Sequence, residues 1–104
     1  MEYEVILSAE AQEHFRKIIH YLLNDLKSEQ AAINVMDDME ETISKLSQVA
    51  GSLKLCEHPR LRALKYRTIH FKKHKYFMLY KTIGNEAHVL AIFHDLQDYE
   101  NICR

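Results

Sequence analysis

Two consecutive stretches with helical periodicity constrain the fold of this 104-residue chain more than any other feature of its sequence. In each stretch, apolar residues recur every three or four positions, which places them on one face of an α-helix. The first set is Ala11, Phe15, Ile18, Leu22 and Leu26, and the second is Ala32, Met36, Met39, Ile43, Leu46 and Ala50. Ser8 and Ser28 precede the two sets as N-caps, and Gly51 ends the second. We therefore expect an antiparallel pair of amphipathic helices.

Segments typical of β-strands lie on both sides of this helical hairpin. Tyr3–Leu7 alternates as a short, half-buried strand does. After a loop from Ser52 to Pro59, three runs are rich in Tyr, Ile, Phe, Thr and Val and are expected to be strands. These runs are Leu64–Phe71, Lys75–Ile83 and Ala87–Phe93. The last run is apolar on both faces, which predicts a central strand, and Gly84-Asn85 before it predicts a tight turn.

The predicted order β-α-α-β-β-β defines an α+β fold in which the helical hairpin packs on a small, mainly antiparallel sheet. A chain of this length, with 47% hydrophobic residues, supports one core, so we expect a single domain over residues 1–104. Leu96–Ile102 is expected to add one or two helical turns after the last strand.

The chain shows no feature of a membrane or secreted protein. Its apolar run at Val89–Phe93 is far shorter than the roughly 20 residues that cross a bilayer. The opening Met-Glu-Tyr-Glu-Val has acidic residues where a secretion signal has basic ones. We therefore expect a cytoplasmic protein without a membrane partner.

The net charge of −1 conceals an uneven distribution. Residues 1–57 contain 11 acidic residues against 5 Lys and Arg, and residues 58–104 contain 4 against 9, so the two balances are −6 and +5. Between His58 and Asn85 there is no acidic residue, which suits an anionic partner. The alternative is a solvated strand face whose lysines discourage edge pairing. The acidic residues of the second helix are interpreted as a solvated surface; they are Asp37, Asp38, Glu40 and Glu41.

One group of residues contains the side-chain types that cleavage of a phosphodiester without a metal would require: Arg67, Lys72, Lys73, His74, Lys75, His94 and Tyr99. His94 and Tyr99 are candidates for proton transfer, Arg67 for binding phosphate oxygens, and the lysines for holding the backbone. A strand-end histidine that bonds a neighbouring backbone group is the alternative for His94. His70 and His74 have helical metal-ligand spacing but lie in a strand and turn, so neither a metal site nor a cofactor is expected.

Several segments together resemble the RelE/ParE superfamily of bacterial type II toxins. They are the opening Tyr3–Ala11, the helical hairpin, Leu61–Arg67, Tyr76–Lys81 and the ending Ile92–Glu100. The resemblance covers nearly the whole chain. It implies a β-α-α-β-β-β toxin fold, a cognate antitoxin that wraps the toxin, and growth arrest when the antitoxin is lost.

The resemblance leaves two targets open. RelE-like members cut messenger RNA on the ribosome with an arginine that Arg67 matches, loop lysines, and a C-terminal His or Tyr that His94 and Tyr99 match. ParE-like members inhibit DNA gyrase. Phe77 stands where nucleases of the superfamily often have an arginine, which favours the gyrase branch. The residues expected to bind RNA or another anion are Arg62, Lys65, Lys72, Lys73 and Lys75.

A third interpretation assigns the chain to another class of function. It is a non-catalytic, detoxified binding module that sequesters an antitoxin and co-represses its operon. In that case operator DNA is bound only by the toxin–antitoxin complex, and overexpression of the protein is harmless.

Overall fold

The computed structural model describes residues 2–95. The strands are β1 (Glu4–Leu7), β2 (Arg67–His70), β3 (Tyr76–Ile83) and β4 (Glu86–His94). The helices are α1 (Ala9–His20), α2 (Glu29–Val49) and α3 (Pro59–Ala63), and a π-helical turn, η1 (Tyr21–Asp25), follows α1 directly. This order confirms the predicted β-α-α-β-β-β arrangement, to which the structure adds the short helix α3.

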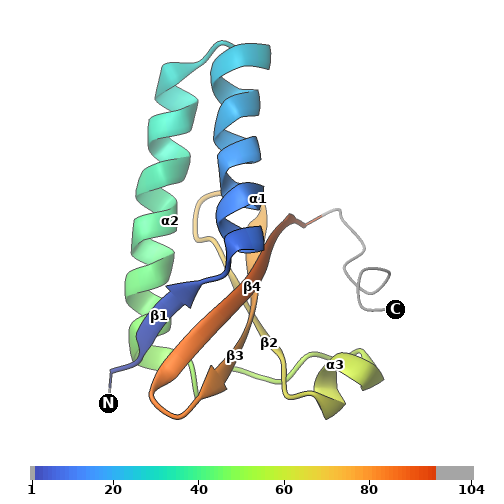
Figure 1. Ribbon diagram of the computed structural model, residues 1–104. Helices are drawn as coiled ribbons and strands as arrows, with labels where there is room; N and C mark the ends of the chain where they lie inside the picture. Colours follow the sequence, from blue (N-terminus) through green and yellow to red (C-terminus); the bar gives the residue numbers. More distant parts are fainter. Residues whose placement is uncertain (1, 96–104) are drawn as a thin grey trace.

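The four strands form one mixed sheet in the order β1-β4-β3-β2. β1 runs parallel to β4, and the other neighbours are antiparallel. β4 lies between β1 and β3, as its apolar sequence predicts, and Gly84 in the β3–β4 turn has a left-handed φ of 58°. The first and the last described strands are therefore neighbours (Figure 1).

The helical hairpin forms as predicted, and its two long helices begin at the predicted caps. The Ser8 side chain accepts a hydrogen bond from the Ala11 amide at 3.0 Å, and Ser28 accepts one from Ala31 at 3.1 Å. Each cap satisfies an amide that the first helical turn leaves without a partner. α1 and α2 lie side by side along one face of the sheet (Figure 1).

The sheet separates two apolar clusters because alternate residues of β3 and β4 point to opposite faces. Met78 and Tyr80 belong to the larger cluster, which lies between the hairpin and the sheet. Phe77 and Leu79 belong to the smaller cluster on the other face, where Leu61 of α3 covers them. The second face is thus covered by a helix that the sequence did not predict.

The structure corrects two predicted boundaries. The first helix does not continue regularly to Leu26, because the Leu26 amide bonds to the Tyr21 carbonyl in a π-type turn. This turn rotates Leu26 away from the core, and the side chain is 55% exposed. The second predicted strand starts at Arg67 rather than at Leu64, because Leu64 is the C-cap of α3.

The helical turns predicted for Leu96–Ile102 lie outside the described residues. Within residues 2–95, every helix is too short or too polar to span a lipid bilayer.

Candidate functional site

Arg67 and His94, the two described residues predicted to act in catalysis, lie far apart on the sheet. Arg67 opens β2 and pairs with Tyr80 in the middle of β3, whereas His94 ends β4 and pairs with Tyr76, the first residue of β3. The length of β3 between those two tyrosines and two strand spacings separate the Cα atoms by roughly 16 Å. Tyr99 lies outside the described residues. The fold therefore does not bring Arg67 and His94 together.

The Arg67 side chain forms a hydrogen bond within the fold. Its Nε donates a hydrogen bond to the Leu53 carbonyl at 2.7 Å, which holds the segment after α2 against β2. Its strand partner Tyr80 is fully buried, and burial raises the pKa of the Tyr80 hydroxyl to about 12 in spite of the nearby guanidinium. One guanidinium nitrogen of Arg67 is therefore used to stabilise the fold.

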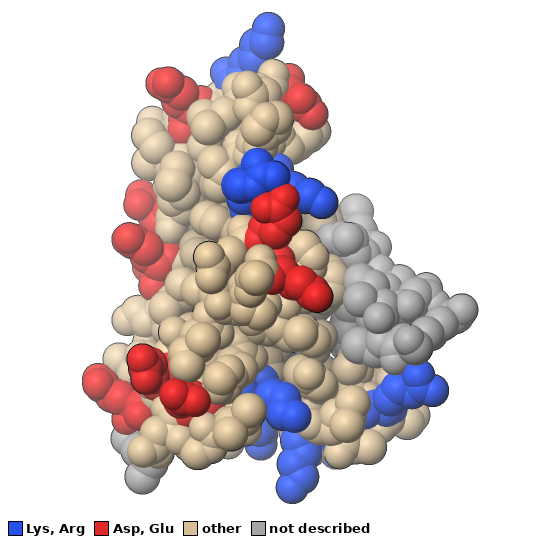
Figure 2. Space-filling view, in the orientation of Figure 1, with Lys and Arg blue, Asp and Glu red and all other residues tan. Residues whose placement is uncertain are grey.

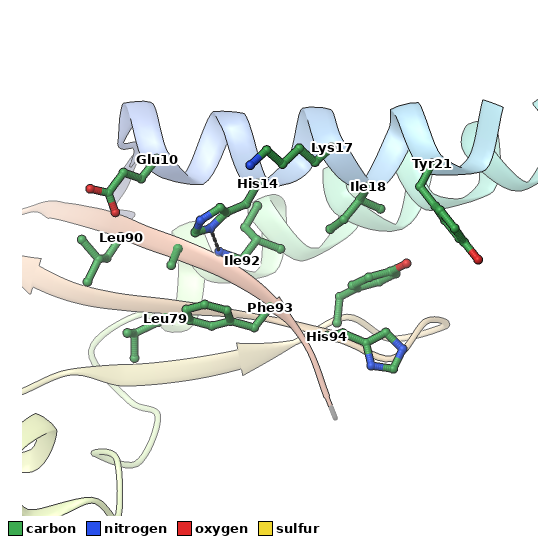
Figure 3. Close-up of a pocket in the computed structure, with 12 residues that line it drawn as sticks. Glu10, His14, Lys17, Ile18, Tyr21, Leu79, Leu90, Ile92, Phe93 and His94 are labelled. Atoms are coloured by element: carbon green, nitrogen blue, oxygen red, sulfur yellow. Dashed lines mark hydrogen bonds between the residues drawn. The ribbon is translucent and has the colours of Figure 1, made fainter. Parts of the chain in front are cut away.

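His94 lies at one end of a cavity of about 670 Å³ between α1 and the edge of β4 (Figure 3). Its ring meets the Tyr76 ring edge-on, with 5.4 Å between the centroids. Near the middle of the cavity, Nδ1 of His14 accepts a hydrogen bond from the Ile92 amide at 3.2 Å. Polar side chains from α1 line one wall, and β4 contributes a mainly apolar wall; the lining includes Glu10, His14, Lys17, Leu90, Ile92 and Phe93.

The strongest polar constellation is at the loop that joins β2 to β3, here called the 72–75 loop (Lys72–Lys75). The backbone amides of Lys72 and Lys73 donate hydrogen bonds to the Asp38 carboxylate of α2 at 3.2 and 2.9 Å. Nδ1 of His74 lies 2.6 Å from the same carboxylate. Lys72, Lys73 and Lys75 themselves are exposed. A buried anion therefore lies beneath an exposed cationic loop.

The prediction that Asp38 belongs to a solvated helix face is wrong. Asp38 lies three residues after Val35 and four before Thr42, both buried, so α2 turns it toward the sheet. Burial by itself raises the pKa of the Asp38 carboxyl, but the hydrogen bonds from His74 and from two backbone amides outweigh it and hold the pKa below its ordinary value. The carboxylate is ionised at neutral pH. The other acidic residues of that stretch, Asp37, Glu40 and Glu41, are exposed as predicted.

The remaining predicted anion-binding residues lie in and directly after α3, before the start of β2. Arg62 and Lys65 are exposed, and Lys65 adopts a left-handed φ of 65° as the chain leaves α3 for β2. Arg62 and Lys65 are called the α3 patch below. Figure 2 shows cations along the lower edge of the molecule and acidic side chains along the side formed by α2. The predicted cationic face is therefore divided between the α3 patch and the 72–75 loop.

The two histidines with metal-ligand spacing have different partners. His74 contacts Asp38, whereas Nδ1 of His70 lies 3.5 Å from the Asp95 carboxylate. In the part of the chain that the structure describes, no three His, Cys, Asp or Glu side chains converge in a geometry that would hold a metal ion.

Two of the residues described above were missed by sequence reasoning. The position of Asp38 beside the buried stripe of α2 was a usable signal, because i+3 and i+4 neighbours share a helix face. His14 gave no signal, since the amide that it binds is 78 residues away in the sequence.

Comparison with known proteins decides the family. The model of the family described as "ParE toxin of type II toxin-antitoxin system, parDE" matches residues 5–99. The chain belongs to this ParE toxin family. A solved structure described as "Chromosomal ParDE TA system from P. aeruginosa" is similar in fold to this ParE-family chain, with a TM-score of 0.70 and 22% sequence identity. The match covers 89% of this chain and 96% of that one. No curated protein matches the sequence.

Family membership confirms the resemblance to the RelE/ParE superfamily and places this chain in a toxin family of type II toxin–antitoxin systems. Such a system implies a cognate antitoxin as a partner.

Proposed function

We propose that this ParE-family toxin arrests growth by binding DNA gyrase in the cytoplasm rather than by cutting messenger RNA. The observation that supports the proposal is the separation of Arg67 from His94. General acid–base cleavage needs both groups within hydrogen-bond reach of the reacting atoms, at about 3 Å each. The Cα atoms of Arg67 and His94 lie roughly 16 Å apart, and Nε of Arg67 already binds the Leu53 carbonyl, so neither the strand positions nor the side-chain contacts favour a shared scissile phosphate.

The charge distribution is also better suited to a protein target than to ribosomal RNA. A protein that binds an RNA backbone gains affinity from many lysine and arginine contacts, and here the net charge is −1. Separate cationic patches, such as the α3 patch and the 72–75 loop, instead match local acidic areas on a protein surface. Gyrase binding requires no bond to be made or broken by the toxin.

The helical hairpin supplies a surface that fits the cognate antitoxin. Of the described residues, several large apolar side chains are exposed around η1 and the first half of α2: Tyr21, Leu23, Leu26, Ile33 and Met36. Ile33 and Met36 lie three residues apart and share one face of α2, and exposed large apolar side chains of this kind favour a partner-binding site. An amphipathic helix of an antitoxin would bury these side chains in the helix-in-groove manner.

The test begins in bacteria that lack the antitoxin. The protein is induced, and thymidine and amino-acid incorporation are followed over the first minutes. We expect thymidine incorporation to fall first, and purified protein to inhibit supercoiling of relaxed plasmid by gyrase. An earlier fall of amino-acid incorporation, with new messenger RNA ends detected by primer extension, would contradict the proposal.

Two variants separate gyrase binding from nuclease activity. His94→Gln and Arg67→Gln remove the groups that an RNA-cutting mechanism would use, and we expect both folded variants to retain growth arrest. A nuclease would lose arrest in both. Harmless induction of the wild-type protein would instead favour the detoxified module that sequesters an antitoxin and reaches operator DNA only within the complex.

A further inference from the structure

We propose that Asp38 is a positioning residue that holds the 72–75 loop in the conformation in which its lysines contact an acidic surface of the target protein. The inference rests on the proposed function, in which the toxin binds a protein. It assigns a role to a residue that neither the sequence nor the family comparison singled out.

The contacts of Asp38 reach across the structure to a single loop. The residue lies in the middle of α2, and its side chain is inaccessible to solvent. Its two carboxylate oxygens accept from the amides of Lys72 and Lys73 and meet the His74 ring, 34 to 36 residues later. Two successive amides that converge on one anion form a backbone nest. In this protein the anion in the nest is an internal side chain.

The nest determines which parts of the loop remain available to a partner. Asp38 uses the backbone amides of Lys72 and Lys73 and therefore leaves their ammonium groups unused. Among residues 2–95, Lys72 and Lys75 form no ion pair, and Nζ of Lys73 approaches Glu41 only to 4.0 Å. The loop consequently presents three exposed cations above one buried carboxylate.

The ends of the loop are fixed by the sheet, so Asp38 is needed only for its middle. The Phe71 amide bonds to the Tyr76 carbonyl at 2.9 Å, and the Asp95 amide bonds to the Lys75 carbonyl at 2.8 Å. Between these points, residues 72–74 contact α2: the backbone amides of Lys72 and Lys73 and the His74 ring bind Asp38, and the Lys73 ammonium lies near Glu41. Neighbouring cations repel one another, and a charge-assisted hydrogen bond to a buried anion offsets this repulsion. Without Asp38 the loop would lose both its anchor and its internal counter-charge.

The test compares Asp38→Asn with Asp37→Asn. Both variants remove one negative charge from adjacent positions of α2, but Asp37 is exposed and lies outside the contacts of the loop. Hydrogen exchange measured by NMR reports the amides of Lys72 and Lys73 directly. We expect exchange at these amides to rise by about tenfold or more in Asp38→Asn, with unchanged protection of the Met78 amide in β3, and no change in Asp37→Asn. Unchanged exchange at Lys72 and Lys73 in Asp38→Asn would overturn the anchoring role.

A double-mutant cycle decides whether Asp38 acts through the lysines. The triple variant K72A/K73A/K75A keeps the anchor and removes the cations, and each protein is titrated into the gyrase supercoiling assay. We expect Asp38→Asn alone to raise the half-inhibitory concentration by about tenfold, and to have no further effect in the triple variant. An equal loss in both backgrounds would show that Asp38 acts through the general fold and would overturn the proposal.

Inhibition of gyrase by the wild-type protein tests the proposed function separately from the role of Asp38. If wild-type protein does not inhibit supercoiling, the proposed function fails, and the cycle is read instead from growth arrest in cells, which depends on no assumption about the target. Hydrogen exchange decides the anchoring in either case.

Discussion

At the scale of single residues, two buried polar groups connect parts of the chain that are distant in sequence. Tyr80 is fully buried in the centre of the sheet, and its hydroxyl donates a hydrogen bond of 2.8 Å to the Ala50 carbonyl at the end of α2. Asp38 makes the corresponding connection from the middle of α2 to the 72–75 loop. Buried polar groups of this kind are costly to leave without a partner, so each one specifies a particular packing of the helix on the sheet.

Tyr80→Phe tests the first connection. The substitution keeps the ring and removes the hydroxyl, which leaves the buried Ala50 carbonyl without this donor. We expect the free energy of unfolding to fall by about 1–2 kcal/mol in urea denaturation, with an unchanged m-value. Tyr21→Phe, on a ring that is 48% exposed, serves as the control and should change the free energy by less than about 0.5 kcal/mol. A Tyr80→Phe protein as stable as the wild type would contradict the assigned role of this hydrogen bond.

Asp38 also predicts a pH dependence of stability. Because folding lowers its pKa, the carboxylate stabilises the folded state above its ordinary pKa of 3.8, and this contribution is lost as the pH falls through the lower, folded value. We expect the free energy of unfolding to fall less steeply in Asp38→Asn than in the wild type between about pH 5 and pH 2. Asp37→Asn should follow the wild-type curve. Parallel curves for all three proteins would refute the prediction.

At the scale of helices and strands, the elements begin where local chemistry permits. The serine caps of α1 and α2 and the positive φ of Gly84 depend on residues within a few positions, and all of them were predictable. The cap of α2 has a further role, because Ser28 follows Lys27, whose left-handed φ of 51° turns the chain between the two helices. Loss of this cap would loosen both the helix start and the turn.

Ser28→Ala should therefore lower the free energy of unfolding by about 1 kcal/mol, because the Ala31 amide loses its acceptor. Ser44→Ala, at an exposed position inside the same helix, is the matched control. Alanine has the higher helix propensity, so the control should be neutral or slightly more stable. Both variants are compared by thermal and urea denaturation, and equal destabilisation of the two would contradict a specific role for the cap.

Features that depend on distant contacts could not be predicted from the sequence. The π-type turn at Tyr21–Asp25 lies where α1 leads into the turn of the hairpin. The helix α3 forms where Leu61 packs on the second face of the sheet. The separation of Arg67 from His94 follows from the strand order, in which β3 lies between their strands. Residue types alone placed both in one candidate site. For Asp38 the sequence did contain the signal. Its position on the helix predicts burial, but the general expectation that an aspartate is solvated led to the wrong prediction.

At the scale of the whole molecule, acidic and basic residues are concentrated in different parts of the surface. Exposed acidic residues lie along α2, at Asp37, Glu40 and Glu41, and exposed cations occupy the α3 patch and the 72–75 loop. Separation of this kind orients a protein as it approaches a charged partner and raises the association rate more than the final affinity. The effect depends on ionic strength because mobile ions screen exposed charges.

Inhibition of gyrase should therefore weaken as the salt concentration rises from about 50 to 300 mM KCl, with most of the change in the association rate. K72A/K73A/K75A should lose a large part of this salt dependence. Lys27→Ala, at the far end of the helical hairpin, should retain it. Association rates from surface plasmon resonance give the comparison, and an equal salt dependence in all three proteins would exclude the 72–75 loop from the encounter.

The parallel pairing of β1 with β4 has a consequence for the synthesis of the protein. β1 is made before the other three strands, but β4, which joins it to β3, is the last of the four to be made. The side chain of Ser8 must find the Leu90 carbonyl, 82 residues later. Contacts of such sequence separation form late in folding. A nascent chain that ends before β4 therefore lacks the strand that joins the two parts of the sheet, so translation interrupted before residue 86 yields a product without the toxin fold.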